Sequence, residues 1–190
     1  MSNGHGASNY EASWWPSFER LVRSRHSFPN ATFVNGAVHS TDSTFAMYCL
    51  DVLLPASVDV VFIEFDLNNA QKQNEGATRS VELLVRKVLR LPTRRPAVVL
   101  VHVPSGNQQR FVDSIADAEN VLVPYYGLSS ISLRDVYWHY GIDDVWAGPH
   151  TDHRHPGDLG CAIMAELAAR LISRYTSKGH LRDLEDPPIP

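Results

Sequence analysis

An aspartate and a histidine near the C-terminal end of the chain have the spacing of an acid–base pair. Asp152 precedes His155 by three residues, just ahead of Pro156. Imidazole has an unperturbed pKa of about 6.5, so a histidine can act as a general base at neutral pH. A carboxylate that accepts the proton of one ring nitrogen fixes the tautomer and stabilises the imidazolium. The spacing permits His155 to act as a base oriented by Asp152, but on spacing alone a solvated polar turn before a helix is the more frequent interpretation.

The same stretch also permits a metal site, because His150 and His153 accompany Asp152 and His155. Zinc loops do use histidines a few residues apart, but they usually take further ligands from a second segment. The histidines that could supply such ligands are His39, His102 and His139, and none has an informative spacing. We therefore expect no metal and no cofactor.

Composition narrows the class of protein. The chain has 190 residues and 44% hydrophobic content, enough for one domain with a sizeable core. With 17 Lys and Arg against 21 Asp and Glu, its formal net charge is −4, which gives no footprint for nucleic acid or an anionic membrane. No apolar run approaches the roughly 20 residues of a membrane-spanning helix. The first residues lack the pattern of a secretory signal, and we expect Cys49 and Cys161 to be free thiols.

Hydrophobic patterning predicts strands alternating with helices. The runs 58–65 and 97–103 are nearly unbroken and rich in β-branched residues, as in parallel strands covered on both faces. Two shorter strands are expected at 31–35 and 121–124. Helices are expected at 14–27, 43–54, 80–91, 110–118, 133–140 and 158–175, with a polar loop at 66–76. The helix at 80–91 places Val81, Leu84, Val85 and Val88 on one face, and the last helix has a stripe of Leu159, Ile163, Leu167 and Leu171.

This alternation predicts an α/β fold with a parallel sheet and right-handed crossovers. Ligands of open α/β sheets bind at the carboxyl ends of the strands. The loops after Val34, Phe65 and Val103, and the loop before the last helix, should therefore carry the chemistry. We expect a single domain over residues 1–176 and a disordered tail over 177–190.

Four blocks, in order, resemble the SGNH (GDSL-type) hydrolases, and most closely a plant and algal branch. They run from Glu64 to Asn68, Leu84 to Pro92, Tyr125 to Arg134 and Asp152 to Pro156, and the resemblance covers about residues 4–175. It implies a three-layer α/β/α, flavodoxin-like fold. It also implies hydrolysis of a carboxylic ester, including an acyl group on a carbohydrate, by a Ser-His-Asp mechanism without a cofactor. His155 would be the base and Asp152 its orienter. The oxyanion hole would use the Asn68 amide and a backbone N–H at Ser40.

The chain departs from this family in three places. Ser40, or its neighbour His39, stands where the family has its oxyanion glycine, and Asp66 replaces a second glycine beside the site. An ionised Asp66 that pointed into the site would oppose a developing oxyanion. The family's first strand, which carries the nucleophile, has no counterpart here. If Gly4-His5-Gly6-Ala7 matches the end of the family's Ser-x-x-x-Gly-x-Gly-Ala, the serine falls one residue before Met1; in the other register it is Ser2.

Two functions follow from these observations. The first is a serine esterase that acts on a small-molecule or carbohydrate ester, with no nucleic-acid partner and no membrane segment in this chain. The second is a catalytically inactive SGNH-like domain that serves as a binding or accessory module, because the nucleophile block is absent.

Overall fold

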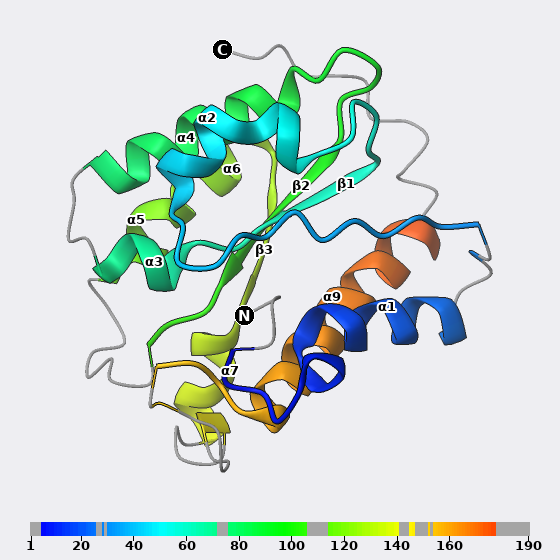
Figure 1. Cartoon of the computed structure of the whole chain (residues 1–190), viewed down its shortest axis with the longest axis vertical. Coiled ribbons are helices and arrows are strands. Elements are labelled where there is room, and N and C mark those ends of the chain that lie inside the picture. The colour runs from blue at the N-terminus through cyan, green and yellow to red at the C-terminus, as the bar shows by residue number, and fades with distance from the viewer. Residues whose placement is uncertain are drawn as a thin grey trace. The chain divides into compact units, whose positions relative to one another are not determined.

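The computed structural model describes residues 5–25, 28, 30–71, 76–105, 114–140, 145–146, 152 and 154–177 (Figure 1). The chain divides into two compact units. The first unit comprises residues 1–35 and 144–190, and the second unit comprises residues 36–143. Of the expected tail over 177–190, Ser177 ends a helix, and residues 178–190 lie outside the described residues. No helix among those described is long and apolar enough to cross a membrane.

The second unit is built on a three-stranded parallel sheet in the order β1-β2-β3. Its strands are β1 (Val60–Ile63), β2 (Ala97–His102) and β3 (Ser129–Ser132). The central strand β2 is buried along nearly its whole length, whereas burial alternates along β1, at one edge of the sheet. A continuous apolar run thus marks the strand that has neighbours on both sides. The predicted α/β class with a parallel sheet is confirmed.

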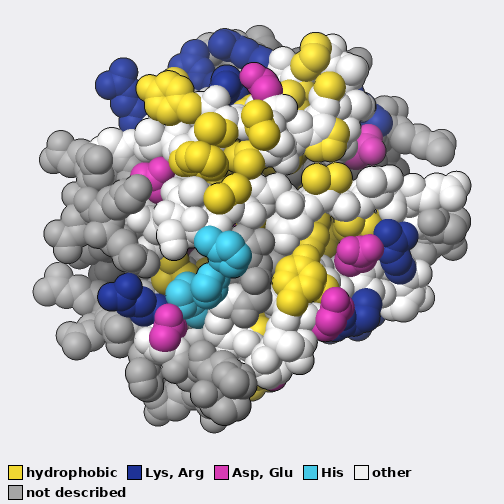
Figure 2. Space-filling view, in the orientation of Figure 1, with side chains coloured by type: hydrophobic (Ala, Val, Ile, Leu, Met, Phe, Trp, Pro, Cys, Tyr) yellow, Lys and Arg dark blue, Asp and Glu magenta, His cyan; other side chains and the backbone are white. Residues whose placement is uncertain are grey.

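Six helices of the second unit are described: α2 (Ser43–Leu53), α3 (Asp66–Gln71), α4 (Gly76–Leu89), α5 (Ile115–Asn120), α6 (Leu122–Tyr126) and α7 (Leu133–Tyr140). The predicted apolar face of α4 is correct, since Val81, Leu84, Val85 and Val88 are all buried. Helix α2 packs along α4 (Figure 1). The other side of α2 exposes Tyr48 and Val52, and hydrophobic side chains gather in that part of the surface (Figure 2).

The first unit pairs helix α1 (Trp14–Arg25) with α9 (Asp158–Ser177), and a short 3-10 helix, η1 (Tyr10–Ala12), precedes α1 (Figure 1). The predicted apolar stripe of α9 is wrong, because Leu159 is 51% exposed. Its buried face consists of Cys161, Met164, Ala165, Ala168 and Ala169. Because α1 brings the bulky Trp14 and Phe18 to its own buried face, small residues on α9 leave room for them.

Two predicted strands are absent from the described residues. Residues 31–35 adopt no regular secondary structure. Residues 121–124 enter helix α6 instead, and the strand begins later, at Ser129. Pro124 is tolerated in the first turn of α6, where backbone N–H groups have no intrahelical partner. Gly127 then ends that helix in the left-handed conformation, with φ of 64°.

The predicted polar loop at 66–76 is also wrong at its start, because α3 begins at Asp66. The backbone N–H groups of Asn68 and Asn69 donate to the carbonyl of Phe65, at 3.0 and 2.8 Å. An aspartate in the first turn also favours the positive end of a helix dipole. Both cysteines are free thiols, as expected.

Candidate active site

Asp152 and His155 lie in one turn immediately before helix α9. Nδ1 of His155 is 2.8 Å from Oδ2 of Asp152. The other carboxylate oxygen, Oδ1, accepts the backbone N–H groups of His155 at 2.9 Å and Arg154 at 3.0 Å. Since a carboxylate only accepts, Nδ1 is the nitrogen that carries the proton. The structure thus brings these two predicted residues together, in the tautomer that leaves Nε2 for proton transfer.

The Asp152 carboxylate is held in its charged form. Burial acts to raise its pKa, but the backbone N–H groups of His155 and Arg154 and the imidazole of His155 outweigh burial and lower the pKa of Asp152 to about 2. The Asp152 side chain is 53% exposed and that of His155 is 20% exposed. An anion therefore faces Nδ1 at any neutral pH, as orientation of a base requires.

Residues 145–146 of the same unit form hydrogen bonds with the turn that carries His155. Nε1 of Trp146 donates to the carbonyl of Arg154 at 3.2 Å. The backbone N–H of Gly157 donates to the carbonyl of Val145 at 3.0 Å. A Cβ on Gly160 would lie 2.5 Å from Cβ of Pro156. A side chain at position 160 would therefore push the turn away from α9.

Residues near the N-terminus, His5, Gly6 and Ser8, lie against the same turn and the start of α9. The ring of His5 stacks on that of His155, with centroids 5.3 Å apart. Gly6 has φ of +84°, and a Cβ there would lie 2.6 Å from Cβ of His155 and 2.5 Å from the carbonyl oxygen of Pro156. Two residues on, the backbone N–H of Ser8 donates to Asp158 at 2.7 Å. Glycine at position 6 is thus what permits the block to lie against His155.

The two predicted oxyanion-hole residues, Asn68 and Ser40, belong to the second unit. Asn68 lies on α3, and its Nδ2 donates to the carbonyl of Thr41, the residue after Ser40. A carboxamide nitrogen has two N–H donors, so one remains for another acceptor. The structure therefore brings the Asn68 amide and the Ser40 segment to the same place.

Ser40 adopts the conformation that the family's glycine would adopt more easily. Its φ is +58°, the one positive value found for a non-glycine residue among those described. For an L-residue the left-handed region costs roughly 1–2 kcal/mol. Such strain persists where the surrounding structure imposes it, and it is common at functional sites.

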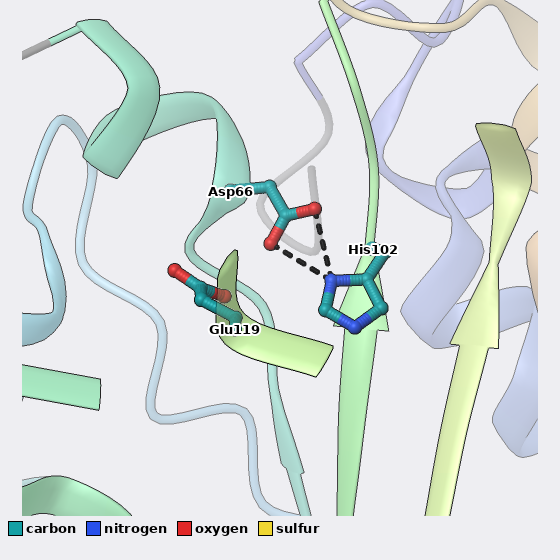
Figure 3. A group of neighbouring side chains, drawn as sticks. All are labelled: Asp66, His102 and Glu119. Atoms are coloured by element: carbon teal, nitrogen blue, oxygen red, sulfur yellow. Dashed lines mark hydrogen bonds and ion pairs between the residues drawn. The ribbon is translucent and has the colours of Figure 1, made fainter. Parts of the chain in front are cut away.

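The second departure, Asp66, has its carboxylate turned into the interior of the second unit. It is 2% exposed, and its oxygens lie 3.1 and 3.2 Å from Nδ1 of His102, at the end of β2 (Figure 3). Beside it lies Glu119 of α5, which is 3% exposed. The Asp66 carboxylate is therefore engaged with His102 and Glu119, instead of facing the amide of Asn68 as an unpaired charge.

Sequence reasoning missed this buried cluster of Asp66, His102 and Glu119. Its three ligand atoms lie within 4.8 Å of one another, so among the described residues these are the ones close enough to hold a metal ion. Nε2 of His102 points away from Asp66 (Figure 3) and has no hydrogen-bond partner in the described part of the chain. The sequence signal was weak: an acidic residue after one strand and a histidine at the end of the next.

The carboxyl group of Glu119 is strongly perturbed by its surroundings in this cluster. Burial, and then the neighbouring Asp66 charge, raise the pKa of Glu119 to about 9, although a hydrogen bond from Asn69 acts in the opposite direction. Glu119 is therefore protonated at neutral pH.

Known proteins resemble this chain in structure. No family model and no curated protein matches it. A solved structure of a two-domain esterase (CEX) active on acetylated mannans, co-crystallised with mannopentaose, is similar over 100% of the chain, with 26% identity and a TM-score of 0.74. A second structure of a two-domain esterase with that activity gives 25% identity and a TM-score of 0.73. The chain covers 50% of each of these structures, so it spans about half their length.

A possible lipase from Chitinophaga pinensis DSM 2588 has the same fold, with a TM-score of 0.58 and 15% identity over 83% of this chain and 87% of its own. These neighbours confirm the expected resemblance to SGNH (GDSL-type) hydrolases and the expected α/β fold.

Proposed function

We propose that this chain provides the catalytic domain of an SGNH-type serine esterase that hydrolyses a carboxylic ester. The observation that carries the proposal is the hydrogen bond of 2.8 Å between Nδ1 of His155 and Oδ2 of Asp152. It is supported by the second oxygen of Asp152, which fixes the backbone of the same histidine. A base whose ring and backbone are both held by one carboxylate needs no rearrangement before it accepts a proton.

In the proposed reaction, Nε2 of His155 takes the hydroxyl proton of a serine, and the serine oxygen attacks the ester carbonyl carbon. The carbonyl oxygen becomes negative in the tetrahedral intermediate and is stabilised by the Asn68 amide and the Ser40 backbone N–H. Collapse breaks the ester C–O bond, and His155 returns its proton to the departing alcohol. Water then repeats the sequence on the acyl-serine and releases the carboxylic acid.

We propose an acyl group on a carbohydrate as the substrate class. The support comes from the solved esterase that is active on acetylated mannans and similar over the full length of this chain. Release of acetate from acetylated mannan, compared with release from p-nitrophenyl acetate, would test this step. Turnover of the nitrophenyl ester alone would limit the proposal to a general esterase.

The nucleophile is proposed to be a serine ahead of the Gly4-to-Ala7 block. The support is the packing of His5 and Gly6, two residues of that block, against His155. A fluorophosphonate probe separates the two registers. Labelling that is lost in Ser2→Ala identifies Ser2. Labelling only of protein that carries residues ahead of Met1 identifies the serine of the family register. Absence of labelling in both forms would contradict the proposed activity.

A non-catalytic binding module is the second candidate. The observation that favours it is that Ser40 and Asp66 stand where the family has two glycines. Such a module would bind a manno-oligosaccharide in calorimetry without labelling by the probe and without release of acetate.

A further inference from the structure

The hydrogen bond from His155 to Asp152 holds one edge of the imidazole ring. Nδ1 lies 2.8 Å from Oδ2 of Asp152, and Oδ1 accepts the backbone N–H of His155 at 2.9 Å. These bonds fix one ring atom and the peptide, but the plane of the ring can still turn, because χ2 of a histidine is a broad torsion. Proton transfer to Nε2 depends on the orientation of the ring as well as on its tautomer. A base that is fully oriented therefore needs a second contact, on the face of its ring.

The ring of His5 makes a contact of this kind. Its centroid lies 5.3 Å from that of the His155 ring, and the two planes are inclined by 27°, so the rings are stacked. This separation lies within the range over which aromatic rings attract one another. Because the nitrogens of an imidazole lie on its edge, a ring on its face does not compete with Asp152 for Nδ1 or with a hydroxyl for Nε2.

The backbone that carries His5 is fixed on its C-terminal side. Gly6 has φ of +84°, and a Cβ at this position would lie 2.6 Å from Cβ of His155. The backbone N–H of Ser8 donates to Oδ1 of Asp158 at 2.7 Å. All of these residues belong to the first unit. The stacked ring is thus attached to a segment whose approach to His155 depends on the missing side chain of Gly6.

The side chain of His5 is not part of the hydrophobic core. It is exposed, whereas the aromatic side chains buried in the described part of the first unit are Trp14, Phe18 and Trp146. Removal of an exposed side chain usually changes stability little. Loss of the His5 ring should therefore affect the orientation of His155 and leave the folding of the chain unchanged.

We infer that His5 is a positioning residue, whose ring lies on the face of His155 and holds the plane of the base while Asp152 holds Nδ1. The inference rests on the proposed function, because it takes His155 as the general base. The stack itself, and its effect on the motion of the His155 ring, do not depend on that function.

The first arm of the test is NMR of the whole chain, with the carbon-bound protons of the His155 ring as probes. In the unsubstituted chain we expect nuclear Overhauser effects between the two imidazole rings, and a ring order parameter close to the rigid-backbone value of about 0.85. His5→Ala should lower this order parameter, whereas His5→Phe keeps a planar ring and should restore it. Tyr10→Ala is the matched control, since Tyr10 is another exposed aromatic residue of the first unit, and it should leave the order parameter unchanged.

The second arm is turnover of p-nitrophenyl acetate by the form of the protein that the fluorophosphonate probe labels. His5→Ala should lower kcat about three- to tenfold, which corresponds to the loss of one aromatic contact. KM should change little, because orientation of the base acts on the chemical step. His5→Phe should recover most of the lost kcat, since stacking needs a ring and not a proton. Tyr10→Ala should keep both constants, and urea melts of all four proteins should have similar midpoints.

Several results would overturn the inference. An order parameter that His5→Ala leaves unchanged would mean that the stack does not hold the ring of His155. A loss of kcat in His5→Phe equal to that in His5→Ala would show that a ring nitrogen is needed, and a change in KM alone would make His5 a substrate-binding residue. Absence of Overhauser effects between the two rings of the unsubstituted chain would remove the contact itself, and this result counts even if a variant fails to fold.

Failure of the proposed function can be distinguished from failure of the inference. If no form of the protein hydrolyses an ester, the proposed function fails, while the NMR arm still decides whether His5 holds the ring of His155. If the unsubstituted protein hydrolyses the ester and His5→Ala leaves kcat unchanged, the inference alone fails.

Discussion

Asp152 holds His155 by two different groups, because one carboxylate oxygen lies 2.8 Å from Nδ1 of the ring and the other accepts the backbone N–H at 2.9 Å. The ring and the peptide that carries it are therefore positioned by the same anion. This double attachment distinguishes the turn from an ordinary polar loop and makes the role of Asp152 testable apart from that of His155.

Asp152→Asn should cost about 10⁴-fold in kcat, because an amide in place of the carboxylate favours the wrong imidazole tautomer. The measurement is hydrolysis of a short-chain nitrophenyl ester by the form of the protein that the fluorophosphonate probe labels. Asp158→Asn is the control, since Asp158 bonds to Ser8 and not to the base. A loss of less than tenfold would leave Asp152 as a residue that only shapes the turn.

Asp152→Asn should also change how the stability of the folded chain depends on acidic pH. The pKa of Asp152 is about 2 in the folded chain against an ordinary value of 3.8, so the folded state binds fewer protons than the unfolded state between these values. Its contribution to stability is therefore present above pH 4 and is lost as the pH falls toward 2. Urea melts at pH 5 and pH 3 should show that Asp152→Asn removes part of the acid sensitivity. Equal sensitivity in both proteins would contradict the hydrogen bonds assigned to the carboxylate.

Local sequence patterns predicted those parts of the molecule that depend on neighbours along the chain. Asp152 and His155 share one turn, and the face of α4 follows from its own spacing. The buried face of α9 was predicted wrongly because a stripe of large apolar residues was expected to be buried. The helix that packs against α9 is α1, which carries large aromatic side chains, so small residues of α9 face it instead. The cluster of Asp66, His102 and Glu119 joins three distant segments, so no spacing within the sequence could reveal it.

Asn68→Ala should lower kcat by about 10²–10³-fold with little change in KM, because an oxyanion donor acts mainly in the transition state. Asn120→Ala, at the exposed end of α5, is a matched control that should leave both constants unchanged. A change in KM alone would make Asn68 a substrate-binding residue.

Ser40→Gly should stabilise the chain by roughly 0.5–1 kcal/mol, since release of the left-handed strain exceeds the extra entropy that glycine gives the unfolded chain. Its backbone N–H survives, so turnover should be retained. Ser40→Ala keeps the strain and should show no gain, which separates the backbone effect from loss of the hydroxyl. Urea melts provide the comparison, and lower stability of the glycine variant would mean that the serine side chain itself is required.

The raised pKa of Glu119 predicts that the free energy of unfolding decreases toward alkaline pH. The pKa of Glu119 rises from 4.5 in the unfolded chain to about 9 when folded, so the folded state holds more protons between these values. Stability should therefore fall as pH rises through this window, by up to about 1.4 kcal/mol per pH unit for one proton. Glu119→Gln should remove this slope. If the stabilities of the two proteins change equally between pH 5, 7 and 9, that result would contradict the raised pKa of Glu119.

The central claim is that His155 is the general base of an ester hydrolase. The direct measurement is turnover of p-nitrophenyl acetate by the probe-labelled form of the protein, with His155→Ala and, as control, Asn120→Ala at an exposed position of the second unit. We expect His155→Ala to lose nearly all hydrolysis and the control to keep it. Turnover in His155→Ala within twofold of the unsubstituted protein would contradict the account.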